Sequence, residues 1–339
     1  MNYQILRSEK EILERLRKNM TPATKDLLCF FSSSLSAYIT DPLFMTIPLE
    51  DKIVHRGYSV FETTKIFENK IYQLDKHIDR FEKSIDYINL KSKYSHSDFK
   101  SIIMNLSALA RSIEKERDIE IRYFYSAGVG NFSVAVDDSK HTFYAFALRA
   151  YNELRPVNGT EEYSVNINEL KTQAAKSKNT NYLINSMTTK QSKDKGGFLG
   201  IMTDSDGCLL ESPISNVAFL MEDDSFWVPP FEKTLAGTTV IRCMNYIEKV
   251  LIPEGVVKEI VRGYVTIDDV RIGREKSSNE KIKVKEIMML GGDFLIPILK
   301  LDVMQITREP GNLARKLQNF LLNDKKGEES NELVPELKF

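Results

Sequence analysis

A short segment near the middle of the chain, Tyr151 to Gly159, most limits how the 339 residues can fold. It contains Pro156, Asn158 and Gly159 with few apolar residues, a composition typical of turns and linkers. The chain before it has about 150 residues, the usual size of one domain. The sequence therefore predicts a domain at 1–150, a linker at 151–159, a domain at 160–325 and a polar tail at 326–339.

Strand and helix patterns are mixed in the first half. Two β-like runs between Val60 and Leu74 flank Glu68-Asn69-Lys70, which is a hairpin signature. A capped helix is expected from Asp75 to about Leu90, because apolar residues recur there at helical spacing. Strands are expected from Ile119 to Tyr125 and from Thr142 to Leu148. This mixture predicts the α+β fold class.

The second half is expected to alternate short strands with two helices. A turn is expected at Asp204-Ser205-Asp206-Gly207, where four turn-forming residues separate two apolar runs. The expected helices run from about Asn181 to Lys195 and from Thr238 to Val250, and the expected strands are Tyr163 to Ile167, Phe198 to Asp204, Cys208 to Glu211, Asn216 to Met221 and Ser225 to Val228. A further helix is expected near the N-terminus after Ser8, whose hydroxyl can cap it with Glu11 three residues on.

Composition excludes several classes of partner. The chain has 47 basic and 48 acidic residues, so no broad charge favours nucleic acid or anionic lipid. No apolar run reaches the ~18 residues that span a bilayer, and the N-terminus lacks a signal core, so a soluble protein is expected, in the cytoplasm or, as the alternative, in an organelle. Three cysteines and four histidines are scattered without metal-ligand spacing, so we expect no catalytic metal.

Several short motifs follow one another in a fixed order. They are Val54-His55-Arg56-Gly57, Val60-Phe61-Glu62-Thr63, His77-Ile78-Asp79-Arg80, Lys178-Asn179-Thr180-Asn181-Tyr182-Leu183, Gly196-Gly197, Glu211-Ser212-Pro213-Ile214-Ser215-Asn216 and Gly237-Thr238-Thr239. This series resembles the fold-type-IV pyridoxal 5'-phosphate enzymes: the branched-chain and D-amino-acid transaminases and the aminodeoxychorismate lyases. The resemblance runs from about Ser8 to Leu322 and implies their two-domain architecture and a homodimer.

The resemblance implies that Lys178 holds the cofactor as a Schiff base. Lys178 lies three residues before Asn181, as in the D-amino-acid transaminases and the lyases. Lys176 is the alternative, because branched-chain enzymes have a longer gap at this point. A lysine suits this chemistry because its amine loses a proton readily when it is desolvated.

Other cofactor contacts follow from the same resemblance. Glu211, with Asn216 five residues on, would lie beside the pyridine nitrogen, where a carboxylate keeps the ring protonated. Arg80 would bind the phosphate through its guanidinium. Tyr182 matches a tyrosine that bonds the ring hydroxyl, although a core tyrosine is the competing interpretation.

Glycines and threonines are expected to complete the phosphate site. Gly237, Thr238 and Thr239 open a predicted helix, whose backbone N–H groups and dipole favour an anion. Gly291 and Gly292 fall where family members often carry hydroxyl residues, so this chain departs from the pattern there.

Substrate contacts are expected from the first domain. Thr63 occupies the position of a threonine that assists proton transfer in the lyases, while Phe61 and Lys65 would line the same pocket. Arg122 matches an arginine that contacts acidic side chains in branched-chain enzymes. Ala127 to Phe132 replaces a bacterial D-transaminase loop whose arginine and histidine hold a carboxylate, and it contains neither residue type.

These matches predict an aminotransferase that uses pyridoxal phosphate with a branched-chain or D-amino acid donor and a 2-oxo acid acceptor. The alternative is an aminodeoxychorismate lyase that makes 4-aminobenzoate and pyruvate. A third interpretation, a non-catalytic relative, is supported only by Gly291 and Gly292.

Overall fold

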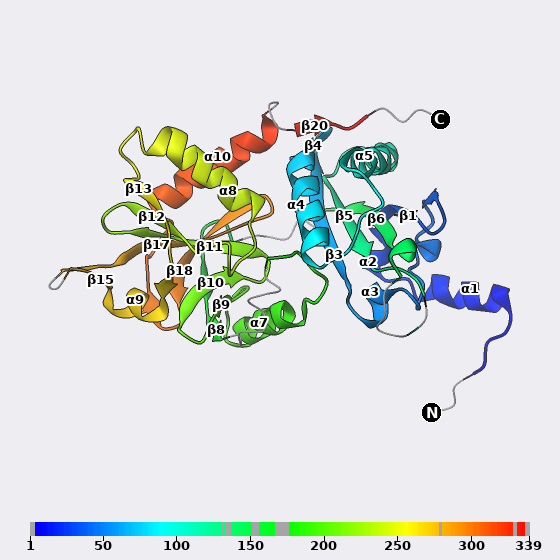
Figure 1. Cartoon of the computed structure of the whole chain (residues 1–339), viewed down its shortest axis with the longest axis horizontal. Helices are drawn as coiled ribbons and strands as arrows, with labels where there is room; N and C mark the ends of the chain where they lie inside the picture. Colours follow the sequence, from blue (N-terminus) through cyan, green and yellow to red (C-terminus); the bar gives the residue numbers. More distant parts are fainter. Residues whose placement is uncertain are drawn as a thin grey trace. The chain divides into compact units, whose positions relative to one another are not determined.

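A computed structural model describes residues 4–130, 132, 137–150, 156–166, 176–277, 280–327 and 331–335 (Figure 1). The chain forms two compact units, Met1–Tyr151 with Ser330–Phe339, and Asn152–Glu329. The division follows Tyr151, the first residue of the segment in which the sequence predicts a linker. Each unit has its own sheet and its own core, and the prediction of an α+β fold is confirmed.

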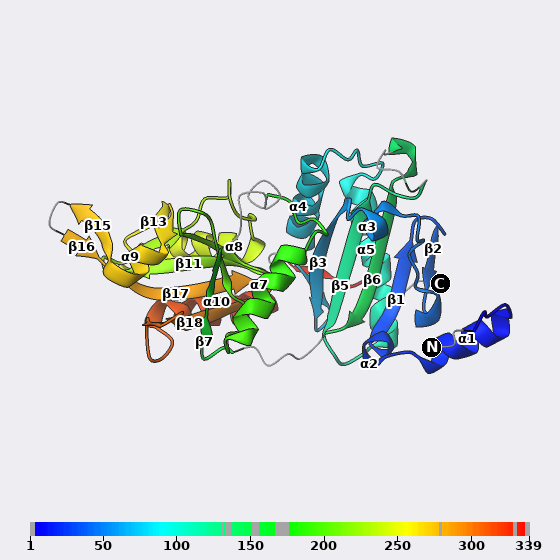
Figure 2. The ribbon, with the colours of Figure 1, turned by 90° about the horizontal axis from the view of Figure 1, so that it is seen from below.

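The first unit is built on an antiparallel sheet of seven strands in the order β2-β1-β6-β5-β3-β4-β20. Figure 2 shows β2, β1, β6, β5 and β3 side by side. The strands of this sheet are β1 (Leu27–Ser32), β2 (Ala37–Ile39), β3 (Ser59–Phe67), β4 (Lys70–Tyr72), β5 (Ile119–Ser126), β6 (Thr142–Arg149) and β20 (Asn331–Leu333). The last of these comes from the end of the chain. The segment that the sequence describes only as a polar tail therefore supplies an edge strand to the first unit.

Two helices cover one face of this sheet: α4 packs on β3, and α5 packs on β1 and β6. The helical elements are α1 (Glu9–Lys18), α2 (Pro22–Lys25), η1 (Pro42–Phe44), α3 (Lys52–His55), α4 (Leu74–Tyr87), α5 (His96–Ile113) and η2 (Asp138–Lys140). The α4 helix begins at Leu74, after Gln73 in the left-handed conformation with φ 55°. Asp75 is therefore not its cap, as the sequence suggests, but a first-turn residue that binds Lys100 of α5.

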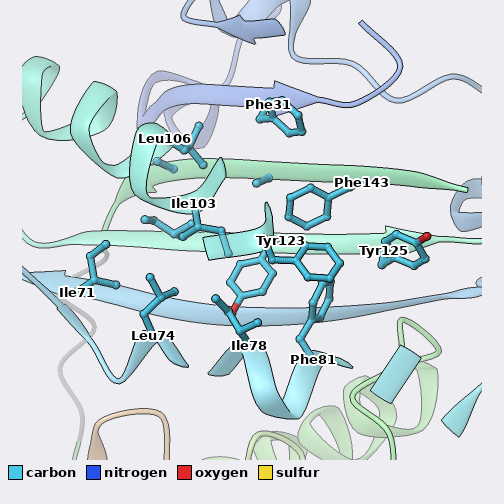
Figure 3. Packing of buried hydrophobic residues seen from close by; sticks show 14 of the residues in the cluster. Phe31, Ile71, Leu74, Ile78, Phe81, Ile103, Leu106, Tyr123, Tyr125 and Phe143 are labelled. Atoms are coloured by element: carbon cyan, nitrogen blue, oxygen red, sulfur yellow. The ribbon is translucent and has the colours of Figure 1, made fainter. Parts of the chain in front are cut away.

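The core of the first unit lies between the sheet and these two helices (Figure 3). Leu74, Ile78, Phe81 and Ile85 recur at helical spacing along α4, and all four are at most 1% exposed. The Phe81 ring meets the Tyr123 ring of β5 edge-on, with 4.9 Å between centroids. This packing fixes α4, which also carries Arg80, against the sheet.

The second unit is built on a larger sheet of eleven strands. They are β7 (Thr160–Glu162), β8 (Ser164–Asn166), β9 (Ile201–Thr203), β10 (Cys208–Ser212), β11 (Ser215–Met221), β12 (Ser225–Val228), β13 (Glu259–Arg262), β14 (Val265–Thr266), β17 (Val284–Gly291), β18 (Phe294–Leu301) and β19 (Met304–Gln305). A separate hairpin pairs β15 (Arg274–Ser277) with β16 (Glu280–Ile282). The central strands β10, β11 and β17 contribute buried residues to the core.

Two helices of the second unit, α7 and α8, begin within the predicted site motifs. The helical elements of this unit are α7 (Leu183–Asp194), α8 (Thr238–Tyr246), which continues as the π-helical η3 (Ile247–Leu251), α9 (Ile267–Ile272) and α10 (Asn312–Lys326). Both α8 and α10 pack on β17. Within the described residues, we find no helix with the length and apolarity required to cross a membrane.

Candidate active site

Lys178 and Tyr182 lie together at the start of α7. The Lys178 side chain is half-buried, and its Nζ donates a hydrogen bond of 3.3 Å to the Tyr182 hydroxyl. Lys176, the alternative Schiff-base residue, is exposed. Of the two lysines, Lys178 is therefore the one whose amine is partly shielded from solvent and held by a neighbouring side chain.

The α7 helix is hydrogen-bonded to the turn that follows Glu211. The buried Asn185 side chain of α7 donates from Nδ2 to the Pro213 carbonyl at 2.6 Å. Ile184 packs against a small apolar cluster that includes Leu210, the neighbour of Glu211 on β10. These contacts bring the segment of Lys178 and Tyr182 to the β10–β11 hairpin.

Glu211 and Asn216 are direct partners across that hairpin. Glu211 is 8% exposed, and its Oε2 accepts the backbone N–H of Leu235 at 3.0 Å. Asn216 donates from Nδ2 to the carbonyl oxygen of the same Leu235 at 2.7 Å. The loop before α8 is thus held by Glu211, which the sequence assigns to the cofactor ring, and by Asn216, which the sequence assigns to the cofactor site.

Gly237 brings the start of α8 onto Asn216. A Cβ atom at Gly237 would lie 1.9 Å from Asn216 Oδ1, so only glycine allows this approach. Gly237 precedes the helix and offers no side chain to cap it. The first-turn N–H groups and the positive end of the helix dipole of α8 form a suitable anion site.

Thr239 and Gly292 are also brought together. The Thr239 hydroxyl donates to the Gly292 carbonyl oxygen at 2.8 Å. A hydroxyl has one proton, so in this arrangement Thr239 donates to the Gly292 backbone, and its expected part in a phosphate site stays a prediction. Thr238 is half-buried at the first position of the helix.

Gly291 departs from the family pattern for a steric reason. A Cβ atom there would lie 2.6 Å from the Ile214 carbonyl oxygen and 2.6 Å from Ser215 Cβ. The adjacent Gly292 has φ 63°, a conformation that other residues rarely adopt. A hydroxyl residue does not fit at 291, so the backbone of this turn is what could face a phosphate.

The candidate substrate residues share one face of the first unit's sheet. Phe61, Thr63 and Lys65 alternate along β3 and are half-buried. Thr63 pairs in register with Arg122 of β5. The Arg122 side chain is 45% exposed, and its Nε lies 2.6 Å from Glu120 Oε1. The sheet thus places Arg122 directly beside Thr63, which lies 59 positions earlier in the chain.

Arg80 lies on the opposite side of β3, where it binds Glu62. Its Nε and Nη2 donate to the two carboxylate oxygens at 2.6 and 2.7 Å. Burial alone would raise the pKa of Glu62, but the charges of Arg80 and His77 hold it well below its usual range. Glu62 stands in one of the sequence motifs, yet sequence reasoning assigns it no role.

Arg56 is a second residue whose position the sequence does not reveal. It follows α3, and its Nη2 donates to the Phe132 carbonyl oxygen at 2.5 Å. The stretch from Ala127 to Phe132 contains no arginine of its own, so the residue that follows α3 supplies a guanidinium to it. The Val54-His55-Arg56-Gly57 motif is the signal from which this residue could have been chosen.

A cluster of ion pairs joins α4 to α5. Asp79, Glu82 and His96 each offer a potential ligand atom, and these atoms lie within 4.8 Å of one another. His96 Nδ1 lies 3.0 Å from Glu82 Oε2, and His96 Nε2 lies 3.3 Å from Asp75 Oδ1. A protonated histidine between carboxylates accounts for this geometry, and the sequence expectation of no catalytic metal stays a prediction.

Comparison with known proteins relates this arrangement to one family. The family model described as amino-transferase class IV matches residues 59–300. The chain is 30% identical over 321 residues to the D-amino-acid transaminase, chloroplastic, of Arabidopsis thaliana, covering 94% of this chain and 81% of the relative.

Solved structures show the same fold at lower identity. A branched-chain aminotransferase from Thermoproteus uzoniensis superimposes with a TM-score of 0.77 at 16% identity, covering 91% of this chain and 100% of that one. A fold IV transaminase from Curtobacterium pusillum gives a TM-score of 0.68 at 19% identity, covering 82% and 90%. The fold-type-IV architecture is thereby confirmed, and the chain belongs to the class IV aminotransferase family.

Proposed function

We propose that the protein is a pyridoxal-phosphate-dependent aminotransferase that moves an amino group from a small amino acid to a 2-oxo acid. The observation that carries the proposal is that Glu211 and Asn216 both form hydrogen bonds to the backbone of Leu235. Leu235 lies two residues before Gly237, which directly precedes α8. These hydrogen bonds set a buried carboxylate beside a helix N-terminus suited to phosphate. Lys178 lies shortly before α7, and α7 forms a hydrogen bond to the β10–β11 hairpin that carries Glu211 and Asn216.

Each of these residues has a definite task. Bound pyridoxal phosphate supplies the electron sink that stabilises negative charge at the substrate's α carbon. Lys178 would hold the cofactor covalently and then carry the proton to and from that carbon. Glu211 would keep a proton on the ring nitrogen, and Tyr182 would donate to the ring hydroxyl. The backbone N–H groups of α8 and the Arg80 guanidinium would bind the phosphate.

The donor is proposed to be a D-amino acid or a branched-chain amino acid. The relative from Arabidopsis thaliana is named a D-amino-acid transaminase, and the solved structure from Thermoproteus uzoniensis is named a branched-chain aminotransferase. Phe61 and its stacked neighbour Phe124 give the proposed substrate face an apolar part. Arg122 and Arg56 are the cations that we propose for substrate carboxylates, since guanidinium groups bind them in a bidentate manner.

The lyase remains the second candidate because of Thr63. Its side chain lies on the same half-buried face as Phe61 and Lys65, and not on the face covered by α4. A hydroxyl there is suited to assist proton transfer while aminodeoxychorismate is split into 4-aminobenzoate and pyruvate. The family of solved relatives named as transaminases favours the first candidate.

The resemblance to this family also implies that two chains assemble. We propose a homodimer, in the cytoplasm or in an organelle, with amino acids and 2-oxo acids as its small-molecule partners. Light scattering of the purified full chain measures the mass directly. A mass of one chain at micromolar concentration would contradict the dimer.

A spectrum tests the cofactor proposal. The purified chain, incubated with pyridoxal phosphate and freed of excess, should absorb near ~410–420 nm and lose this band on borohydride reduction, as a lysine Schiff base does. Peptide mapping of the reduced protein should find the label on Lys178 and not on Lys176. Lys178→Ala should abolish the label, while Lys176→Ala should keep it. A colourless wild-type protein sinks the proposal.

A donor panel separates the two candidate reactions. D-Alanine, L-leucine and aminodeoxychorismate are each offered, with 2-oxoglutarate as the acceptor for the two amino acids. The aminotransferase predicts glutamate from one of the amino acids and no 4-aminobenzoate. Formation of 4-aminobenzoate and pyruvate without glutamate would identify the lyase instead.

A further inference from the structure

Glu62 is a fully buried carboxylate that none of the proposed steps uses. It lies on β3 between Phe61 and Thr63, and its side chain points to the face of the sheet that α4 covers. We propose that Glu62 is a positioning residue that orients Arg80 for the cofactor's phosphate. The inference rests on the proposed function, because it needs Arg80 to meet that phosphate.

The contact between the two side chains fixes the guanidinium in two places. Arg80 Nε donates to Glu62 Oε2 at 2.6 Å, and Arg80 Nη2 donates to Glu62 Oε1 at 2.7 Å. A two-point contact of this kind sets the plane of the guanidinium as well as its distance. Glu62 accepts from Nε and from one N–H of Nη2, so a phosphate would approach the guanidinium on its Nη1–Nη2 side. The direction in which that side points is therefore set by Glu62.

Glu62 is itself held by the strand. Its Oε1 accepts the backbone N–H of Thr63 at 2.8 Å, and His77 Nδ1 lies 3.3 Å from the same oxygen. The position of the Arg80 guanidinium is therefore fixed relative to β3, and this strand presents Phe61 and Thr63 on its other face. One carboxylate would align the phosphate contact with the proposed substrate face.

A purely structural role makes a different prediction. If Glu62 only neutralised the charge of Arg80, its replacement by a neutral residue would leave a stronger positive field and would bind a phosphate more tightly. If Glu62 orients Arg80, the same replacement loosens the guanidinium and weakens phosphate binding. The sign of the change in phosphate affinity therefore separates the two roles.

Tyr123 offers a matched probe inside the same packed region. Its hydroxyl is fully buried and has no hydrogen-bond partner among the residues that the structure describes. Figure 3 shows the hydroxyl end of the ring directed to α4, next to Ile78. Tyr123→Phe removes this group without touching the Glu62–Arg80 contact. It controls for disturbance of the core beneath the pair.

The experiment compares pyridoxal phosphate with pyridoxal, which lacks the phosphate, by equilibrium titration of the full-length chain. The ratio of the dissociation constant for pyridoxal to that for pyridoxal phosphate reports the phosphate contact alone. Glu62→Gln should reduce this ratio about tenfold, the effect of losing one hydrogen bond to a charged group. Tyr123→Phe should leave it unchanged. Glu114→Gln, which breaks the 2.7 Å contact with Arg149 elsewhere in the unit, should also leave it unchanged.

Two further variants keep the test decisive. Glu62→Asp retains the negative charge, which protects folding, but its shorter side chain cannot hold both nitrogens, so it should lower the ratio in the same direction. In an Arg80→Gln background, Glu62→Gln should have no further effect, because Glu62 acts through Arg80. Unchanged or higher ratios for Glu62→Gln and Glu62→Asp overturn the inference. A wild type without preference for the phosphorylated compound overturns the proposed function itself, and the inference with it.

Discussion

Glu211 and Asn216 face each other across the β10–β11 hairpin, and each forms one hydrogen bond to the backbone of Leu235. Glu211 accepts from its N–H and Asn216 donates to its carbonyl oxygen. Both backbone groups of one loop residue are thus satisfied by neighbouring side chains. Because Gly237 lies two residues later, the start of α8 is set by two residues that the sequence assigns to the cofactor site.

Gly237→Ala should damage this arrangement. The new methyl group would lie 1.9 Å from Asn216 Oδ1, so Asn216 or the start of α8 must move. Overpacking of this kind destabilises by about 1–3 kcal/mol. We expect a lower free energy of unfolding in urea without cofactor, together with weaker binding of pyridoxal phosphate.

Gly327→Ala is the matched control for that change. Gly327 ends α10 with φ −67°, and a Cβ atom there would lie 3.3 Å from the nearest backbone oxygen. Its stability should stay within about 0.5 kcal/mol of the wild type, as for most surface substitutions. Equal stability of the two variants would show that the contact of Gly237 with Asn216 is not tight.

Gly291→Ser should destabilise the protein, although it supplies the hydroxyl that many relatives carry. Its Cβ would lie 2.6 Å from the Ile214 carbonyl oxygen. We expect a loss of about 1–3 kcal/mol in urea unfolding and no gain in affinity for pyridoxal phosphate. A stable variant that binds the cofactor more tightly would contradict the steric explanation.

Arg122→Gln should raise the KM for 2-oxoglutarate about tenfold, the effect of losing one hydrogen bond to a charged group. The kcat should change little, because the contact is to the substrate and not to the reacting atoms. Arg117→Gln is the matched control, since the Arg117 side chain is 46% exposed and that of Arg122 is 45% exposed. Identical kinetics for both variants would remove Arg122 from the proposed substrate site.

Stability should depend on pH through His96. Burial lowers the pKa of His96, but hydrogen bonds to Glu82 and Asp75 outweigh it and raise the pKa above its ordinary value of 6.5. A raised pKa in the folded state means that the stabilisation is complete below the unfolded pKa, and that it disappears as the pH rises through the folded pKa. Lys100 also faces Asp75, at 3.0 Å, and shares that carboxylate.

His96→Gln measures this contribution. The variant should be less stable than the wild type near pH ~6, by about 0.2–1 kcal/mol for each exposed ion pair, and should approach it near pH ~9. Urea unfolding at several pH values gives the difference directly. A difference that grows with pH would contradict the predicted sign.

Local sequence patterns determined many elements correctly. The predicted strand Ser225 to Val228 is β12 with the same bounds, and the Ser8 hydroxyl accepts the N–H of Glu11 at the start of α1. The turn at Asp204 to Gly207 is present, with Gly207 at φ 73°. These features depend on residues a few positions apart, so the sequence alone contains the signal.

The residues of the candidate site were also chosen from the sequence, but their arrangement was not. Ordered motifs pointed to Lys178, Glu211 and the helix after Gly237, whereas no pattern indicates that Glu62 binds Arg80 or that Gly291 touches the Ile214 backbone. Such contacts join residues that are distant along the chain and meet only after sheets and helices pack.

The end of the chain shows the same division. No element is predicted between Val250 and the tail, yet the structure forms α10 there and adds β20 to the edge of the first unit's sheet. Local propensity decides where helices and short strands can form, so composition and motif order determined the fold class and the family. Long-range packing decides which edge of a sheet a strand joins and which buried charges form a pair. Only the tertiary structure therefore showed that β20 joins β4 and that Glu62 binds Arg80.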